Sequence, residues 1–98
     1  MTEWAFGKSK RKVDKELLAK IKNDPCAICG SRKDVDPAHI KSRGSGGPDE
    51  EWNLIALCRL DHIRQHASGF VKLYEKHESF RLALQAKGWL ISNGRLKR

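Results

Sequence analysis

The sequence predicts a small α+β domain, and three observations support this fold class. The chain has 98 residues, of which 39% are hydrophobic, enough for one modest core. Short apolar runs typical of strands alternate with longer stretches whose apolar residues recur at helical spacing. Clusters of glycine and proline separate these elements. We therefore expect a single domain over residues 13–98, preceded by a basic arm at residues 1–12, with no internal repeat.

The first predicted element is a short amphipathic helix over residues 13–22. Its lysines lie away from its apolar face, and Asp24-Pro25 ends it, because the residue before a proline avoids helical geometry. The apolar face comprises Val13, Leu17, Leu18 and Ile21.

Two short strands follow. The first is predicted over residues 35–40, with Pro37 suited to a sheet edge. The second is predicted over residues 54–57. Residues 41–49 between them are rich in glycine and are predicted to form a loop.

The rest of the chain is predicted to be helical, with a hairpin at the end. A helix begins near Cys58 and is broken at Ser68-Gly69. Residues 70–87 form the longest helical pattern, and Gly88 ends it. The Asn93-Gly94 pair between two short apolar runs is typical of a tight hairpin turn. The apolar members of the long helix are Phe70, Leu73, Tyr74, Phe80, Leu84 and Leu82.

The charge distribution indicates a polyanionic partner. Net charge is +8, with nine Lys/Arg against four Asp/Glu in residues 1–33, seven against eight in residues 34–86, and four against none in residues 87–98. The flanks are basic and the middle is nearly neutral. Nucleic acid is the natural partner for such a chain, although solvated basic tails would give the same count.

No apolar run approaches the roughly 20 residues of a membrane span, and the first residues lack a secretory signal. We expect a cytoplasmic protein with no membrane partner. In a reducing compartment three cysteines are better explained as metal ligands than as disulfide partners.

The cysteines predict a structural zinc site. Cys26 and Cys29 have the C-x2-C spacing that lets two thiolates bind one tetrahedral ion, and Cys58 could close the site. We favour Asp61 as the fourth ligand, since it leaves His62 and His66 for a second metal. Ligand sets that use either histidine instead, and buried thiols without a metal, remain open alternatives.

The histidines supply a second set of reactive groups. His39 lies on the first strand, Asn53 precedes the second strand, and His62 and His66 are four residues apart on a helix. That spacing puts two imidazoles on one helix face, where both can reach a single cation. A general base beside a divalent cation suits hydrolysis of a phosphodiester. Each histidine taken alone has an ordinary structural explanation.

Residues 26–69 resemble the HNH endonucleases of the zinc-ribbon type, within the ββα-metal (His-Me finger) nuclease superfamily. The resemblance implies two antiparallel strands and a helix around one catalytic metal, braced by the zinc knuckle. It runs through Cys26, Cys29, Ala38-His39-Ile40, Gly46-Gly47, Asn53-Leu54, Leu57-Cys58 and His62-x3-His66.

The resemblance also implies residue roles. His39 would be the general base, and Asn53 would tie the loop that orients it. His62 and His66 would bind Mg²⁺ or another divalent ion such as Mn²⁺ or Ni²⁺. Many members carry an acidic or histidine ligand just before the base, where this chain has Ala38. Asp36, on the same strand face, is the residue that could replace this ligand, directly or through water.

The remaining expectations concern substrate and partners. Lys41, Arg43 and Arg64 lie near the expected site and could hold phosphates. One site cuts one strand, so a monomer would nick double-stranded DNA, and a double-strand break would need a homodimer or two nearby nicks. The alternative is a non-catalytic zinc-dependent DNA-binding module. A nuclease acting on RNA or on branched DNA would use the same site.

Overall fold

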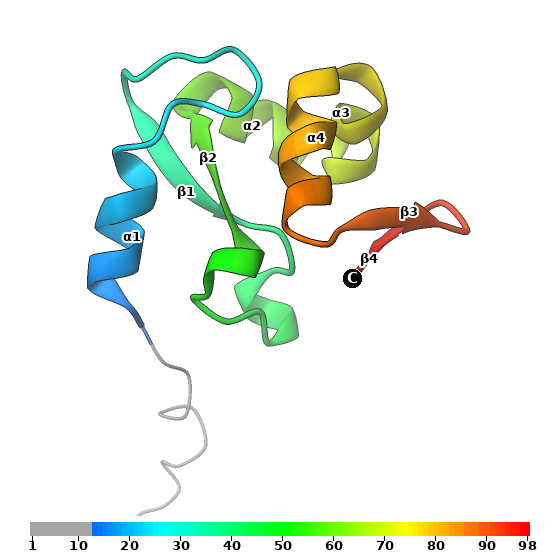
Figure 1. Ribbon diagram of the computed structural model, residues 1–98, viewed down its shortest axis with the longest axis horizontal. Coiled ribbons are helices and arrows are strands. Elements are labelled where there is room, and N and C mark those ends of the chain that lie inside the picture. Colours follow the sequence, from blue (N-terminus) through cyan, green and yellow to red (C-terminus); the bar gives the residue numbers. More distant parts are fainter. Residues whose placement is uncertain (1–12) are drawn as a thin grey trace, which may run out of the picture.

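The computed structural model describes residues 13–98, and the predicted basic arm at residues 1–12 lies outside the described part. An N-terminal helix precedes a two-stranded sheet, and three helices and a hairpin follow (Figure 1). The elements are α1 (Lys15–Lys22), β1 (Val35–His39), β2 (Leu54–Cys58), α2 (Arg59–Ser68), α3 (Phe70–Lys76), α4 (Glu78–Ala86), β3 (Leu90–Ser92) and β4 (Arg95–Lys97), with short 3-10 helices at Arg43–Ser45 and Glu51–Asn53.

Helix α1 begins later than predicted. Asp14 is its N-cap and accepts a hydrogen bond from the Leu17 N–H at 3.0 Å, which satisfies one of the donors exposed at a helix start. The helix ends at Lys22, just before Asp24-Pro25, as predicted. Val13, expected on the apolar face, is 50% exposed because it precedes the cap and has no helical position.

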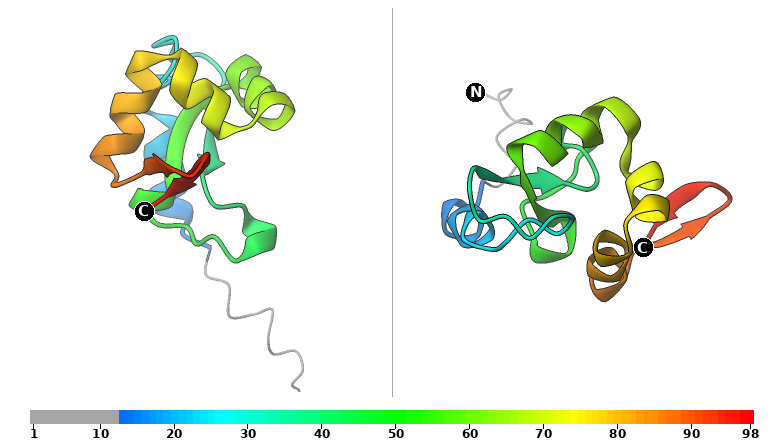
Figure 2. Two further views of the ribbon diagram at one scale, coloured as in Figure 1. Left: turned by 90° about the vertical axis from the view of Figure 1, so that its right-hand side faces the viewer. Right: turned by 90° about the horizontal axis from the view of Figure 1, so that it is seen from above.

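Strands β1 and β2 pair antiparallel, with Val35 opposite Cys58 and His39 opposite Leu54. The two faces of this sheet are buried against different helices. Leu54 and Ala56 pack with Ile21 of α1, and Ile55 and Leu57 pack with α3, α4 and the hairpin. In Figure 2, α1 and the α3–α4 pair accordingly lie on opposite sides of the sheet.

The predicted single helix over residues 70–87 is wrong, since the structure has two helices there. His77 joins α3 to α4 in an extended conformation (φ −117°, ψ 113°). The break turns α4 back onto α3, so that the Phe80 ring stacks on Phe70 with centroids 5.9 Å apart. Arg81 secures the turn by donating to the Tyr74 carbonyl. Leu82 was expected among the apolar residues of the buried helix face, but its side chain is 55% exposed.

The C-terminal hairpin forms as predicted. Asn93 and Gly94 both have positive φ (54° and 75°), the geometry that a two-residue turn between twisted strands requires. The Trp89 indole N–H, just before β3, donates to the Trp52 carbonyl at 2.7 Å. The hairpin is thereby attached to the segment that leads into β2.

The α+β class and the small ββα core of β1, β2 and α2 are confirmed. Within residues 13–98, no helix combines the length and the apolar character needed to cross a membrane.

Candidate active site and metal centre

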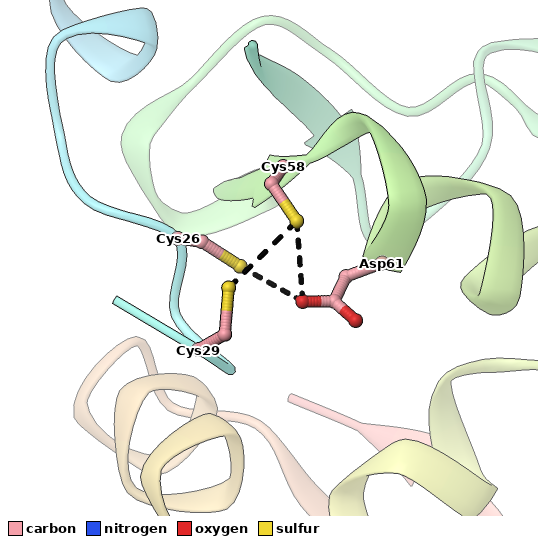
Figure 3. Close-up of side chains that lie close together, drawn as sticks. All are labelled: Cys26, Cys29, Cys58 and Asp61. Carbon is pink, nitrogen blue, oxygen red and sulfur yellow. Dashed lines mark hydrogen bonds between the residues drawn. The ribbon is translucent and has the colours of Figure 1, made fainter. Parts of the chain in front are cut away.

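The three cysteines meet at one end of the sheet. Cys26 and Cys29 come from the turn after α1, Cys58 ends β2, and Asp61 lies in the first turn of α2 (Figure 3). The Cys26 and Cys58 thiols lie 3.2 Å and 3.3 Å from Asp61 Oδ2. All four ligand atoms lie within 4.8 Å of one another.

This cluster fits a tetrahedral zinc ion. Two thiolates each bound to zinc at about 2.3 Å stand about 3.8 Å apart across a tetrahedron, and the Sγ atoms of Cys29 and Cys58 are 3.8 Å apart. Cys26 and Asp61 are buried, with exposures of 3% and 2%. The ligand set of three cysteines and Asp61 is therefore compatible with zinc. His62 and His66, the alternative fourth ligands, do not belong to the cluster.

The protonation state of the ligands in this cluster depends on whether a cation is bound. Burial raises the pKa of the Cys58 thiol to about 12, so without a metal this side chain stays protonated. Burial also opposes ionisation of Asp61, but hydrogen bonds from Cys26, Cys58 and Arg64 outweigh it and lower the pKa of Asp61. One anionic ligand is thus present before metal binding, and binding would displace the thiol protons.

A second site is a pocket of about 520 Å³ beside β1, between α1 and α2. His39 reaches it from β1, and His62 and His66 reach it from α2. The two helix imidazoles have ring centroids 4.9 Å apart, as expected for residues one turn apart. The pocket is lined by Leu18, Pro37, His39, Ile40, Ser42, Arg43, His62, Gln65, His66 and Phe70.

Asp36 adds an oxygen donor near this pair. Its Oδ2 lies 3.5 Å from His62 Nδ1, and its carboxylate also accepts hydrogen bonds from Arg59. The Arg59 bonds, with a further contribution from His62, hold the pKa of Asp36 below its usual value although partial burial opposes this. Within residues 13–98, the cysteine cluster is the one group of three or more side chains whose ligand atoms lie close enough together to hold a metal ion. Asp36 contacts His62 and Arg59, and its carboxylate is not gathered with both imidazoles.

Ala38 offers no donor. It is 1% exposed and packs in the core with Ile55 and Leu57. Side chains alternate along a strand, so Asp36 lies on the same face of β1, nearer the start of α2.

The loop between the strands is fixed by Asn53, which is fully buried. Its Oδ1 accepts from the Lys41 N–H at 2.7 Å, and its Nδ2 donates to the carbonyls of Lys41 and Pro48, both at 3.0 Å. Gly47 allows this closure. A Cβ there would stand 1.8 Å from the Lys41 carbonyl oxygen.

A carboxylate from this loop contacts the strand histidine. Asp49 Oδ1 lies 2.6 Å from His39 Nε2. Asp49 is not among the residues predicted for the site, because it is the first of three consecutive acidic residues, followed by Glu50 and Glu51. The sequence signal that could have found it is its place just after Gly46-Gly47-Pro48, where a closed loop returns towards the strand.

The predicted phosphate ligands occupy different places. Arg43 lines the pocket, and one of its guanidinium nitrogens lies 3.9 Å from Asp49. Lys41 is exposed at the start of the loop. Arg64 instead donates to Asp61 Oδ1 at 3.0 Å and so supports the cysteine cluster from the side.

Comparison with known proteins identifies the segment that contains both sites. Residues 26–68 match the family model described as HNH endonuclease. These residues form an HNH domain. The match includes the cysteine cluster, strands β1 and β2 and all of α2, so the predicted family agrees with the comparison.

A curated relative of this HNH domain is an uncharacterized 38.5 kDa protein in psbA intron 1 of Chlamydomonas moewusii, 43% identical over 51 residues. The alignment covers 52% of this chain and 14% of the length of that protein. No solved structure matches the chain significantly.

Proposed function

We propose that this HNH domain is an endonuclease that hydrolyses DNA phosphodiester bonds with the help of a divalent cation. The observation that carries the proposal is the pocket beside β1, which gathers His39, His62 and His66. A strand imidazole and a pair of helix imidazoles around one cavity provide a general base and a cation site within reach of one substrate group.

Each side chain has a defined task in this proposal. His39 takes a proton from the attacking water. His62 and His66 hold the cation, with Asp36 as the additional oxygen donor in place of the missing ligand at position 38. The cation, when bound, supplies Lewis-acid stabilisation of charge on the phosphate and on the leaving oxygen. The products implied by the family chemistry carry a 5′-phosphate and a 3′-hydroxyl.

The remaining residues position these groups. Asn53 holds the loop so that His39 keeps its orientation. Arg43 at the pocket wall and the exposed Lys41 at the start of the loop contact flanking phosphates. Arg64 is a weaker candidate because it is paired with Asp61. The net charge of +8 supports binding to the DNA backbone regardless of sequence, so affinity should fall steeply as salt is added.

The metals have separate tasks. Zinc at Cys26, Cys29, Cys58 and Asp61 is structural, and Mg²⁺, Mn²⁺ or Ni²⁺ serves at the histidines. With one such site, a monomer nicks one strand of double-stranded DNA, and a homodimer or two nearby nicks are needed to break both.

A second candidate function is a zinc-dependent DNA-binding module without catalysis. The observation that favours it is the burial of Ala38, which leaves the cation with no donor from the position before His39. In that case the protein binds DNA and has no cleavage to lose.

A supercoiled-plasmid assay separates the two. Wild type, His39→Ala and the control His77→Ala are incubated in EDTA and then with Mg²⁺, Mn²⁺ or Ni²⁺. We expect open-circle product from wild type and His77→Ala with metal, and little from His39→Ala. Absence of product from wild type with every metal, with DNA still shifted on a gel, supports the binding module. Parallel assays with single-stranded DNA, branched DNA and structured RNA define the substrate.

A further inference from the structure

The shortest polar contact of His39 is with a buried carboxylate. His39 Nε2 and Asp49 Oδ1 are 2.6 Å apart, and their side chains are 14% and 1% exposed. A charged carboxylate at this depth requires hydrogen-bond partners, because burying it alone is costly.

Asp49 is itself held in place. Its second oxygen, Oδ2, accepts the backbone N–H of Asp14 at 3.1 Å, and Arg43 Nη2 lies 3.9 Å from the same oxygen. Burial opposes its ionisation, but hydrogen bonds from His39 and from the backbone of Asp14 lower the pKa of Asp49 overall. The carboxylate is thus anionic near neutral pH and can only accept hydrogen bonds.

That state of Asp49 determines where the imidazole carries its proton. A carboxylate has no proton to give, so Nε2 of a neutral His39 must be the donor and Nδ1 must carry the lone pair. Within residues 13–98, Nδ1 makes no hydrogen bond. The nitrogen able to accept a proton is therefore left available on a residue that lines the pocket.

The loop closure explains how Asp49 reaches this position. Asn53 Nδ2 binds the carbonyl of Pro48, the residue just before Asp49. Gly47, one residue earlier, lies against Lys41 with no room for a side chain. Both contacts fix the backbone on the N-terminal side of Asp49, so its carboxylate has little freedom to leave His39.

We propose that Asp49 is a positioning residue for the general base: it fixes the Nε2–H tautomer of His39 and its ring orientation, so that Nδ1 accepts the proton from water. This inference rests on the proposed function of His39, and it assigns a role to a residue outside the predicted catalytic set. The same logic operates wherever a carboxylate orients a catalytic histidine.

The first test measures the tautomer and needs no cleavage. Nitrogen-15 shifts of the His39 ring in the full chain report which nitrogen carries the proton. We expect protonated Nε2 in wild type, a larger Nδ1–H fraction in Asp49→Asn, and no change in the control Glu50→Gln, a neighbouring exposed carboxylate. A wild-type His39 protonated at Nδ1 would overturn the proposal. If wild type fails to cleave DNA, the proposed function fails while this measurement still decides the tautomer.

The second test is a double-mutant cycle on plasmid nicking. Asp49→Asn should lower kcat by about 10- to 100-fold with KM little changed, and should cause no further loss when added to His39→Ala. An equal loss in both backgrounds would show that Asp49 acts independently of His39 and would overturn the proposal. Circular dichroism of each variant confirms that the fold is retained.

Discussion

The Asn53 side chain binds both the N–H and the carbonyl of Lys41, twelve residues earlier in the chain. It thereby replaces a backbone pairing where the strands β1 and β2 diverge. With the additional bond to Pro48, its amide uses both donors and its oxygen accepts in a fully buried position.

Asn53→Asp tests this closure. The substitution keeps the size of the side chain but replaces the donor nitrogen with an oxygen facing two carbonyls. Each buried group left unsatisfied costs about 1–3 kcal/mol, so we expect a loss of about 2–4 kcal/mol in the free energy of unfolding. Urea denaturation measures it. The matched control Asn23→Asp, at an exposed helix end, should change stability by less than about 1 kcal/mol. Equal effects of the two substitutions would contradict the structural role.

Gly47→Ala should open the loop. The added Cβ would meet the Lys41 carbonyl oxygen at 1.8 Å and Asn53 Nδ2 at 2.8 Å, and backbone atoms cannot rotate away as a side chain can. We expect a loss of about 3 kcal/mol or more and, under the proposed function, loss of nicking. Gly44→Ala is the control, because a Cβ there meets nothing within 4 Å. Thermal melts and the plasmid assay on both variants check the prediction, which fails if the two behave alike.

The cysteine cluster predicts a specific response to substitution. Cys26→Ser removes a buried ligand and should abolish bound zinc and cooperative unfolding, since a structural zinc contributes directly to folding. Asp61→Cys completes the commoner four-thiolate set and should keep one zinc per chain. Elemental analysis with thermal melts measures both. An unchanged melting temperature in Cys26→Ser, or after chelation, would argue against structural zinc.

Acid should remove the stabilisation that Asp49 provides. Its pKa lies below the ordinary 3.8, so its contribution is fully present above that pH and is lost as pH falls through the folded-state value. The difference in unfolding free energy between wild type and Asp49→Asn should thus be largest near neutral pH and shrink below about pH 4. Urea titrations across this range measure it. Glu75→Gln, at an exposed position on α3, is the reference against which the pH dependence is compared, and a flat difference for Asp49→Asn would refute the account.

Much of the fold could be predicted because its signals are local. The Asn93-Gly94 turn, the helix stop at Asp24-Pro25 and the short apolar strands all depend on neighbouring residues. The break at His77 could not be predicted in this way, since neither glycine nor proline marks it. It forms because packing Phe80 on Phe70 outweighs continuing one helix, and that gain depends on tertiary contacts.

The same distinction applies to the candidate site. Cys26, Cys29 and Cys58 could be found by spacing, as could the pair His62 and His66, because ligand geometry leaves a fixed interval in the sequence. Asp49 has no such fixed interval, because its distance from His39 is set by the whole closed loop, and only its place after Gly46-Gly47-Pro48 hints at it. Glu50 and Glu51, which follow Asp49, carry the same charge, and the loop closure at Asn53 and Gly47 selects which carboxylate turns inward.

The attachment of Trp89 to Trp52 has a consequence for anyone who wishes to move this module into another protein. The family match ends at residue 68, yet the carbonyl of Trp52, next to Asn53, is held by an indole that lies 21 residues beyond that boundary, and Arg98 covers the Trp52 ring at 4.7 Å. A fusion cut at the edge of the match would keep every predicted ligand. It would lose the Trp89 and Arg98 contacts that hold Trp52, the residue before Asn53. Grafts should therefore include the α3–α4 pair and the hairpin as part of the transplanted unit.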